Sequence, residues 1–321
     1  MTEKIKQRKL GTSDISITPI GLGAWQFSEG KSFTGLFWDP LSVEQTNSII
    51  EKAIAEGINW FDTAEMYGGG KSERGLSAGL QEAGVKDDDI RIATKWWPLF
   101  RFARNIRKTI DTRLDNLSPY SIDLYQIHQP YSFSFTRSEM NAMADIADQG
   151  HIRTIGVSNF SADKMRTAFE ELEKRDYPLV SNQVKYSLLE RDIESNGILD
   201  TAKELGITII AYSPLEQGLL TGKFHDQPEL LDNRPFIRKR LLKRRINESE
   251  KLVVLLQQIA EEIDATASEV ALNWLINYHD NVVAIPGASK DYHVEQNANA
   301  MRFELSSEQM SAIATASEQF I

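Results

Sequence analysis

Four ionisable side chains stand at or just beyond the ends of three strand-like segments in this sequence. Asp62 and Tyr67 follow the first segment, Lys95 the second and His128 the third. In a parallel α/β barrel every strand points the same way, so residues at the carboxyl ends of the strands meet at one mouth. A carboxylate, a phenol, an ammonium and an imidazole gathered there have the chemistry to deliver a proton to a carbonyl oxygen.

Eight short apolar segments alternate with segments of helical periodicity, which is the pattern that would position these side chains. The predicted strands span residues 19–24, 58–62, 90–94, 122–127, 152–157, 179–184, 207–212 and 281–285. The predicted helices span residues 43–57, 72–83, 101–117, 137–149, 161–175, 192–205 and 248–264, and a last one begins at Ser306. Alternating strands and helices indicate a parallel sheet, and eight such units favour closure. We therefore predict an α/β fold, a (β/α)8 TIM barrel.

An open, doubly wound sheet is the competing architecture. It needs the glycine-rich first turn G-x-G-x-x-G, and GLGAWQ (21–26) lacks the third glycine. Ahead of the first strand, KLGTSDISITPIGLG (9–23) alternates polar and apolar residues around GTSD, which predicts an N-terminal β-hairpin. Residues 26–41 and 213–247 are too long for simple connections, so we expect long, functional loops at the mouth.

Composition places the chain among ordinary globular proteins and excludes several classes of function. The 321 residues suit one barrel domain spanning 1–321, and the net charge of −10 argues against a general nucleic-acid surface. No apolar run approaches the length of a membrane span, and no secretory signal is visible at the start, so we expect a cytoplasmic protein. Cysteine is absent, which excludes disulfides, thiolate catalysis and thiolate metal sites.

Some motif-like patterns have plainer explanations. GGGKS (68–72) resembles the end of a phosphate-binding loop, but the full pattern needs glycine where Glu65 stands. The five histidines lack the spacing of metal ligands, so no metal site is expected. A carboxylate pair for glycoside hydrolysis stays open, although the strand ends here supply lysine, tyrosine and histidine instead.

Residues 234–245 are mostly basic within an acidic chain. A solvated helix face is one interpretation of this run. A lid whose charges attract an anionic cofactor is a second. A nucleic-acid patch is a third, which the lack of interleaved aromatic residues other than Phe236 disfavours.

Several longer motifs together carry a resemblance to a known family. They are GINWFDTAEMYGGGKSE (57–73), IRIATKW (90–96), IDLYQIHQP (122–130), GVSNF (156–160), NQVKYS (182–187), AYSPLEQGLLTGK (211–223) and IPGAS (285–289). In this order they resemble the aldo-keto reductase family over essentially the whole chain. The chain is similar to the branch with a short C-terminus that includes bacterial general reductases and potassium-channel β-subunits.

The resemblance implies NADPH-dependent reduction of aldehydes and ketones to alcohols by hydride transfer. Tyr67 would match the general acid, Lys95 the activating lysine, Asp62 its partner and His128 the imidazole that orients the carbonyl. A free tyrosine has a pKa of about 10, which makes it a poor acid at neutral pH. We expect a neighbouring lysine cation to lower that pKa by stabilising tyrosinate.

The resemblance also implies a set of cofactor contacts. Ser158, Asn159 and Gln183 would hold the nicotinamide carboxamide, and Tyr212 would stack under the ring. The backbone around Ser213, Leu215 and Gln217 would approach the pyrophosphate. The adenosine end would be contacted by Ser289, Lys290, His293, Gln296 and Asn297.

The adenosine end departs from the family pattern because only one basic residue, Lys290, follows I-P-G-A-S. We expect NADPH to be the cofactor, with NADH use possible, and His293 to add positive charge below neutral pH.

The expected partner is a small carbonyl substrate, with no nucleic acid and no membrane. Trp25 and Trp96 would line its pocket, and Trp97, Phe37 and Trp38 could extend an aromatic funnel. The alternative function is a nicotinamide-binding, redox-sensing regulatory subunit with slow turnover. A barrel hydrolase that binds no such cofactor is a third interpretation, and the sequence leaves the oligomeric state open.

Overall fold

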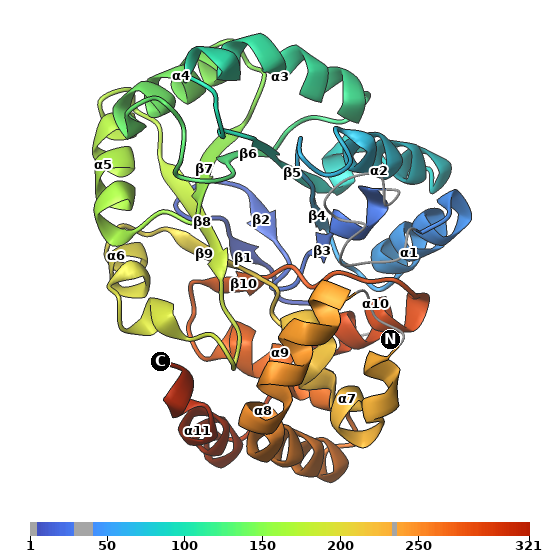
Figure 1. Ribbon diagram of the computed structural model, residues 1–321. Coiled ribbons are helices and arrows are strands. Elements are labelled where there is room, and N and C mark those ends of the chain that lie inside the picture. Colours follow the sequence, from blue (N-terminus) through green and yellow to red (C-terminus); the bar gives the residue numbers. More distant parts are fainter. Residues whose placement is uncertain (1–4, 29–40, 233–235) are drawn as a thin grey trace.

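The computed structural model of this protein describes residues 5–28, 41–232 and 236–321. Its main sheet has eight parallel strands in the order β10-β9-β8-β7-β6-β5-β4-β3, so each strand lies beside its neighbour in the chain (Figure 1). The strands are β3 (Leu22–Gly23), β4 (Trp60–Asp62), β5 (Arg91–Trp96), β6 (Leu124–Ile127), β7 (Thr154–Ser158), β8 (Leu179–Lys185), β9 (Thr208–Tyr212) and β10 (Val282–Ala284). All eight predicted strands are confirmed.

The first and last strands of this sheet meet and close it into a barrel. Ile20 pairs with Ala284 in a parallel bridge, and the Gly21 amide donates to the Ala284 carbonyl at 2.9 Å. Gly21 is required here because a β-carbon at this position would lie 2.3 Å from the indole of Trp60. The predicted (β/α)8 barrel is therefore confirmed, and the open doubly wound sheet is excluded.

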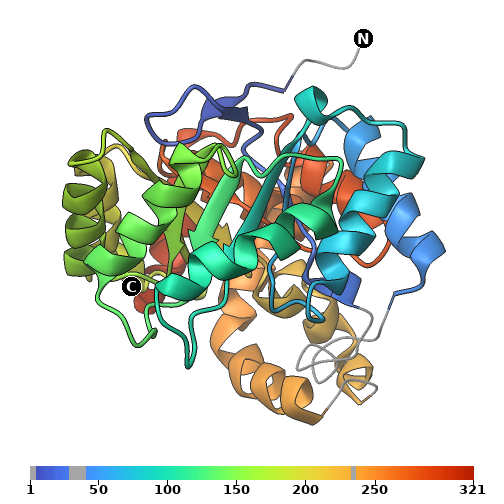
Figure 2. The same cartoon turned by 90° about the horizontal axis from the view of Figure 1, so that it is seen from above.

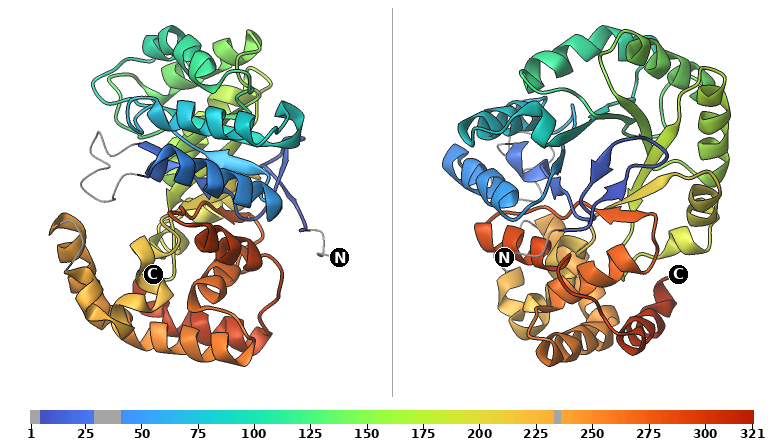
Figure 3. Two further views of the ribbon diagram at one scale, coloured as in Figure 1. Left: turned by 90° about the vertical axis from the view of Figure 1, so that its right-hand side faces the viewer. Right: turned by 180° about the vertical axis from the view of Figure 1, so that it is seen from behind.

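The predicted hairpin plugs one end of the barrel. Its strands β1 (Arg8–Lys9) and β2 (Ser16–Ile17) pair antiparallel and lie across the barrel axis (Figure 3, right). Leu10, Ile15 and Ile17 from the hairpin form one buried cluster with side chains from inside the barrel. Those interior members are Trp60, Ala93, Leu124, Val180, Ile210, Val283 and Ile285.

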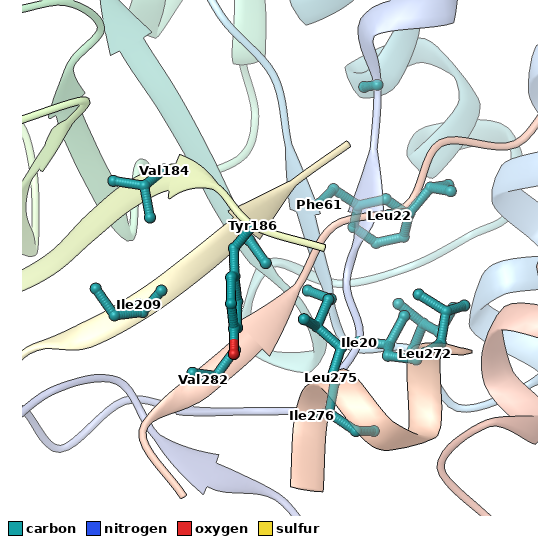
Figure 4. Close-up of a cluster of buried hydrophobic side chains, with 14 of the residues drawn as sticks. Ile20, Leu22, Phe61, Val184, Tyr186, Ile209, Leu272, Leu275, Ile276 and Val282 are labelled. Atoms are coloured by element: carbon teal, nitrogen blue, oxygen red, sulfur yellow. The ribbon is translucent and has the colours of Figure 1, made fainter. Parts of the chain in front are cut away.

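Helices surround the sheet as amphipathic elements that bury one face against it. The helices are α1 (Val43–Ala55), α2 (Lys71–Glu82), α3 (Arg104–Leu117), α4 (Thr136–Asp148), α5 (Ala162–Glu173), α6 (Ile198–Glu204), α7 (Lys223–Asp226), α8 (Phe236–Glu262), α9 (Ala267–Asn277), α10 (Asp291–Asn299) and α11 (Ser307–Ala316). Capping boxes at Ser42, Thr266 and Ser306 fix the starts of α1, α9 and α11 by satisfying exposed backbone amides. Figure 4 shows Leu272, Leu275 and Ile276 of α9 facing Ile20 and Val282 across the outer core.

Two parts of the helical prediction were wrong. Residues 213–247 form the 3-10 helices η5 (Glu216–Thr221) and η6 (Pro228–Leu231), the short helix α7 and the start of α8, which continues to Glu262. Helices α9 and α10 were both missed, and α9 is buried on nearly every side and therefore lacks an amphipathic stripe. The first half of α8 projects at the end of the barrel opposite the hairpin (Figure 2).

The first long loop, 26–41, begins with the 3-10 helix η1 (Trp25–Ser28), and its Phe37 and Trp38 lie outside the described residues. Over the ranges that the structure describes, no helix is both long and apolar enough to cross a membrane.

The hairpin plug gives a first testable prediction. Ile17→Ala should lower the free energy of unfolding by about 2–5 kcal/mol, because it opens a cavity in the closed end of the barrel. Val254→Ala, at a position that is 45% exposed on α8, is the matched control and should change it by no more than about 0.5 kcal/mol. Urea unfolding would measure both, and equal midpoints would show that the hairpin does not belong to the cooperative core.

Candidate active site

The sheet order brings the predicted ionisable residues together at the carboxyl ends of three neighbouring strands. Asp62 ends β4, Lys95 lies near the end of β5, and His128 directly follows β6. The Lys95 ammonium donates to an Asp62 carboxylate oxygen and, at 2.9 Å, to the Thr63 carbonyl. Lys95 is completely buried and Asp62 is 1% exposed, so the pair is shielded from water and each charge depends on the other.

Two amides complete the surroundings of Asp62. Gln183 donates to the second carboxylate oxygen at 2.8 Å, and Gln126 donates to the same oxygen at 3.3 Å. Gln126 was not predicted from the sequence, although it stands two residues before His128 and so shares the inward side of β6. Because one N–H of Gln183 is engaged by Asp62, its oxygen and its second N–H remain for the predicted contact with a carboxamide.

Tyr67 lies on the loop between β4 and α2, directly over this ion pair. The Lys95 ammonium is 5.1 Å from the centre of the Tyr67 ring. The His128 ring meets Tyr67 edge to face, with centroids 5.7 Å apart. The structure thus gathers all four residues of the predicted tetrad at one place.

The electrostatics of the tetrad differ from our expectation in one respect. Burial and the Asp62 carboxylate raise the pKa of Tyr67, so the expected lowering by Lys95 is not found. The reason is geometric, since the ammonium faces the ring while its hydrogen bonds go to Asp62 and Thr63. Burial also lowers the pKa of Lys95, although Asp62 opposes this.

His128 is neutral in this environment. Burial, with a smaller contribution from Lys95, holds the pKa of its imidazole well below the ordinary value of 6.5. Its Nδ1 atom is buried and has no hydrogen-bond partner among the described residues. The neutral imidazole and the protonated phenol can each donate a hydrogen bond to the same oxygen atom.

The tryptophans of the mouth are arranged differently from the prediction. Trp96 is completely buried and packs in the outer core, so its position does not suit the predicted contact with substrate. Alternation along β5 turns Trp96 away from the side that carries Lys95. Trp97 instead meets His128 edge to face at 5.2 Å, and Trp25 lies 6.4 Å from Tyr67.

Several residues predicted to hold the nicotinamide ring adjoin the tetrad. Asn159 has a positive φ of 60°, and its amide side chain donates to the His128 carbonyl at 3.3 Å. The Tyr212 hydroxyl donates to Asn159 Oδ1 at 3.0 Å, and Asn159 Nδ2 also donates to the Ser158 hydroxyl at 3.0 Å. Burial, with a smaller contribution from Tyr67, raises the pKa of Tyr212 to about 12.

The segment after β9, which was predicted to approach a pyrophosphate, has a strained backbone. Ser213, Glu216 and Gln217 have positive φ values of 53°, 46° and 57°, and Leu215 lies between them. The carboxylate of Glu216 accepts from Arg245 of α8 at 2.8 Å and lies 3.1 Å from the Lys185 ammonium. At least one member of the basic run therefore braces this segment.

The residues expected at the adenosine end lie around the start of α10. The Ser289 amide donates to His293 Nδ1 at 3.3 Å. Burial, with smaller contributions from Lys223 and Lys290, lowers the pKa of His293 to about 4. The expectation that His293 becomes cationic below neutral pH is therefore wrong, because partial burial and the charges of Lys223 and Lys290 disfavour its cationic form.

The sequence reasoning also missed two neighbours of this cluster. Lys223 belongs to the segment AYSPLEQGLLTGK and influences the charge of His293. Tyr292 is 51% exposed, and the Lys290 ammonium lies 5.7 Å from the centre of its ring.

A dinucleotide fits this set of residues. Asn297 is 3% exposed, and its buried amide nitrogen has no partner in the part of the chain that the structure describes. Gln296, half-buried, stands beside it on α10. A buried donor without an acceptor is costly, so a ligand that accepts from Asn297 would remove that cost.

Comparison with known proteins identifies the family and the fold. The model of the aldo/keto reductase family matches residues 19–318. An oxidoreductase of Mycobacterium tuberculosis is 36% identical over 308 residues, which cover 95% of this chain and 90% of that protein. A thermostable aldo-keto reductase in complex with the inhibitor epalrestat superposes with a TM-score of 0.79 at 30% identity, covering 97% of this chain and 100% of that one. An aldo/keto reductase from Klebsiella pneumoniae with NADP and acetate has the same fold, with a TM-score of 0.74 at 23% identity, covering 97% and 95%.

The buried ion pair gives a second prediction. Lys95→Met should lower the free energy of unfolding by about 3–5 kcal/mol, because it leaves the Asp62 charge buried without its counter-ion. The double variant Lys95→Met/Asp62→Asn should recover part of that loss, since it removes the stranded charge. Lys52→Met is the matched control, because Lys52 pairs with Glu56 on the surface at 2.8 Å and should cost at most about 1 kcal/mol. Equal losses for Lys95→Met and Lys52→Met in denaturant titrations would contradict the burial argument.

Proposed function

The chain belongs to the aldo/keto reductase family of NAD(P)H-dependent oxidoreductases, and from that premise we propose that it reduces aldehydes and ketones to alcohols with NADPH. Tyr67 is the proton donor in this proposal. The observation that carries it is the stack of Tyr67 over the buried Lys95–Asp62 pair, with the His128 ring at its edge.

The proposed roles follow from the charges of these groups. A raised pKa keeps the Tyr67 phenol protonated at neutral pH, so its proton is present when a substrate arrives. A carbonyl oxygen between the Tyr67 hydroxyl and the His128 imidazole can accept a hydrogen bond from each. The Lys95 ammonium, 5.1 Å from the centre of the Tyr67 ring, is a cation close to the tyrosinate that forms when Tyr67 gives up its proton, and Asp62 holds that ammonium in place.

The cofactor is proposed to lie across the mouth from the tetrad to α10. Ser158, Asn159, Gln183 and Tyr212 hold the nicotinamide end in this proposal, and the backbone of 213–217 lies along the pyrophosphate. When bound, the nicotinamide supplies the hydride. Asn297, Gln296, Ser289 and Lys290 are proposed to receive the adenosine end. Trp25 and Trp97, rather than Trp96, are proposed to flank the substrate.

NADPH is proposed over NADH because the adenosine end offers cations for one further phosphate. Lys290 is exposed at the start of α10, and Lys223 is near enough to influence His293. The neutral His293 contributes a hydrogen-bonding atom rather than a charge. Lysines without a bidentate arginine predict a modest preference.

The test of the proposed function is Tyr67→Phe. This variant keeps the ring and removes the proton, so kcat for an aldehyde should fall by roughly 10²–10⁴-fold. The dissociation constant for NADPH should stay close to that of the unmodified protein, as measured by fluorescence titration. Near-normal aldehyde turnover by Tyr67→Phe would refute the role of Tyr67. An unmodified protein that binds NADPH tightly but scarcely turns over across an aldehyde panel would favour the regulatory alternative.

Lys290→Ala tests the choice of cofactor. Loss of this cation should weaken the binding free energy of NADPH by about 1–2 kcal/mol, the scale for one charge-assisted contact. The binding free energy of NADH should stay nearly unchanged. Lys86→Ala is the matched control, because Lys86 precedes β5 and lies at the opposite end of the barrel from the mouth. Identical affinities of the unmodified protein for the two cofactors would contradict the phosphate site.

A further inference from the structure

The segment that carries Tyr67 has little intrinsic stiffness. Tyr67 is followed at once by Gly68, Gly69 and Gly70, which have positive φ values of 64°, 64° and 86°. Glycine loses more conformational freedom on ordering than any other residue, so contacts elsewhere must fix this loop. The position of the Tyr67 ring over Lys95 depends on those contacts.

One set of contacts precedes Tyr67 and centres on Glu65. Its carboxylate accepts from the Trp97 amide at 3.0 Å and from Arg101 at 2.7 Å. The Glu65 amide in turn donates to the Lys95 carbonyl at 3.2 Å. Glu65 therefore ties the start of the loop to the end of β5, the strand that carries Lys95.

The other set follows Tyr67 and centres on Glu73 of α2, whose side chain is completely buried. Thr94, the neighbour of Lys95 on β5, donates to Glu73 at 2.7 Å. Asn116 of α3 donates to the second oxygen of the same carboxylate at 2.9 Å. Glu73 therefore ties the end of the loop to the same strand.

Arg113 of α3 joins the two sets. Its Nε atom donates to Glu73 at 2.8 Å, and its NH1 atom lies 3.2 Å from a Glu65 oxygen. Its side chain is 4% exposed. A guanidinium can hold two carboxylates at once because its donors point in fixed, different directions, which an ammonium on a flexible stem cannot reproduce.

We propose that Arg113 is a positioning residue for proton donation, because it clamps Glu65 and Glu73 on either side of Tyr67 and so holds the phenol over Lys95. The role is indirect, since Arg113 contacts neither Tyr67 nor the proposed substrate position. It rests on the proposed function, in which Tyr67 is the acid. Misplacement of a reacting group by about 1 Å can cost up to about 10²-fold in rate, so a loosened clamp should be visible in turnover.

Two classes of substrate separate this role from a general loss of structure. Reduction of an aldehyde leaves an alkoxide that must be protonated, so it needs Tyr67. Hydride transfer to a naphthoquinone leaves a hydroquinone anion, whose charge is spread over the ring and which water can protonate later. A defect confined to proton donation therefore slows the aldehyde and spares the quinone, whereas a damaged fold or cofactor site slows both.

The experiment measures kcat for an aldehyde and for a naphthoquinone with saturating NADPH in Arg113→Lys, with Tyr67→Phe beside it. Arg113→Lys should lower aldehyde kcat by about 10-fold or more while quinone kcat and the NADPH dissociation constant stay within about twofold. Arg107→Lys is the matched control on the same helix, because Arg107 pairs with Asp145 of α4 and not with the Tyr67 loop. Arg107→Lys should leave kcat for both substrates unchanged. If Arg113→Lys does not fold, Glu65→Gln is measured by the same criteria, since it keeps the size of the side chain and removes its charge.

The outcomes separate this inference from the proposed function. An aldehyde-selective loss in Arg113→Lys, smaller than that in Tyr67→Phe, supports the clamp. Equal losses for both substrates, or none, overturn the clamp while a selective loss in Tyr67→Phe leaves the proposed function standing. Absence of a selective loss in Tyr67→Phe overturns the role of Tyr67, and the clamp with it.

Discussion

The ion pair between Lys95 and Asp62 is the interaction on which the rest of the site depends. Both side chains are almost fully buried, so neither charge is tolerable without the other. Asp62 meets this demand by accepting from Lys95, Gln126 and Gln183, which come from three different strands. The need to satisfy one buried carboxylate thus fixes the relative positions of β5, β6 and β8 at the mouth.

That arrangement requires a closed barrel, because β8 and β4 do not pair with each other and Gln183 reaches Asp62 only across the interior. Closure depends on the chain around Gly21 running beside β10, where the Trp60 indole leaves no room for a side chain. The hairpin then fills the far end with Leu10, Ile15 and Ile17. The barrel therefore has a polar mouth at the carboxyl ends of its strands and an apolar plug at the other end.

Much of the fold and of the tetrad could be predicted from the sequence because both rest on local patterns. Eight apolar strands identify a barrel, and strand ends identify its mouth. What could not be predicted depends on packing. Because side chains alternate along β5, Trp96 packs in the outer core while Trp97 meets His128 at the mouth. An error of one residue in the predicted position of a strand reverses which side chains face inward. Burial decides the charge of His293 and the pKa of Tyr67, and no sequence spacing reports burial.

Part of the basic run 234–245 pairs with carboxylates near the mouth of the barrel. Three residues with positive φ in the segment after β9 store conformational strain, which persists only where neighbouring contacts hold it. Glu216 supplies such a contact through Arg245 and Lys185, and Arg245 also reaches Glu190 at 3.0 Å. A solvated helix face would leave Arg245 without these carboxylates. The run therefore has at least one internal role, in which Arg245 holds the backbone proposed to lie along an anionic pyrophosphate.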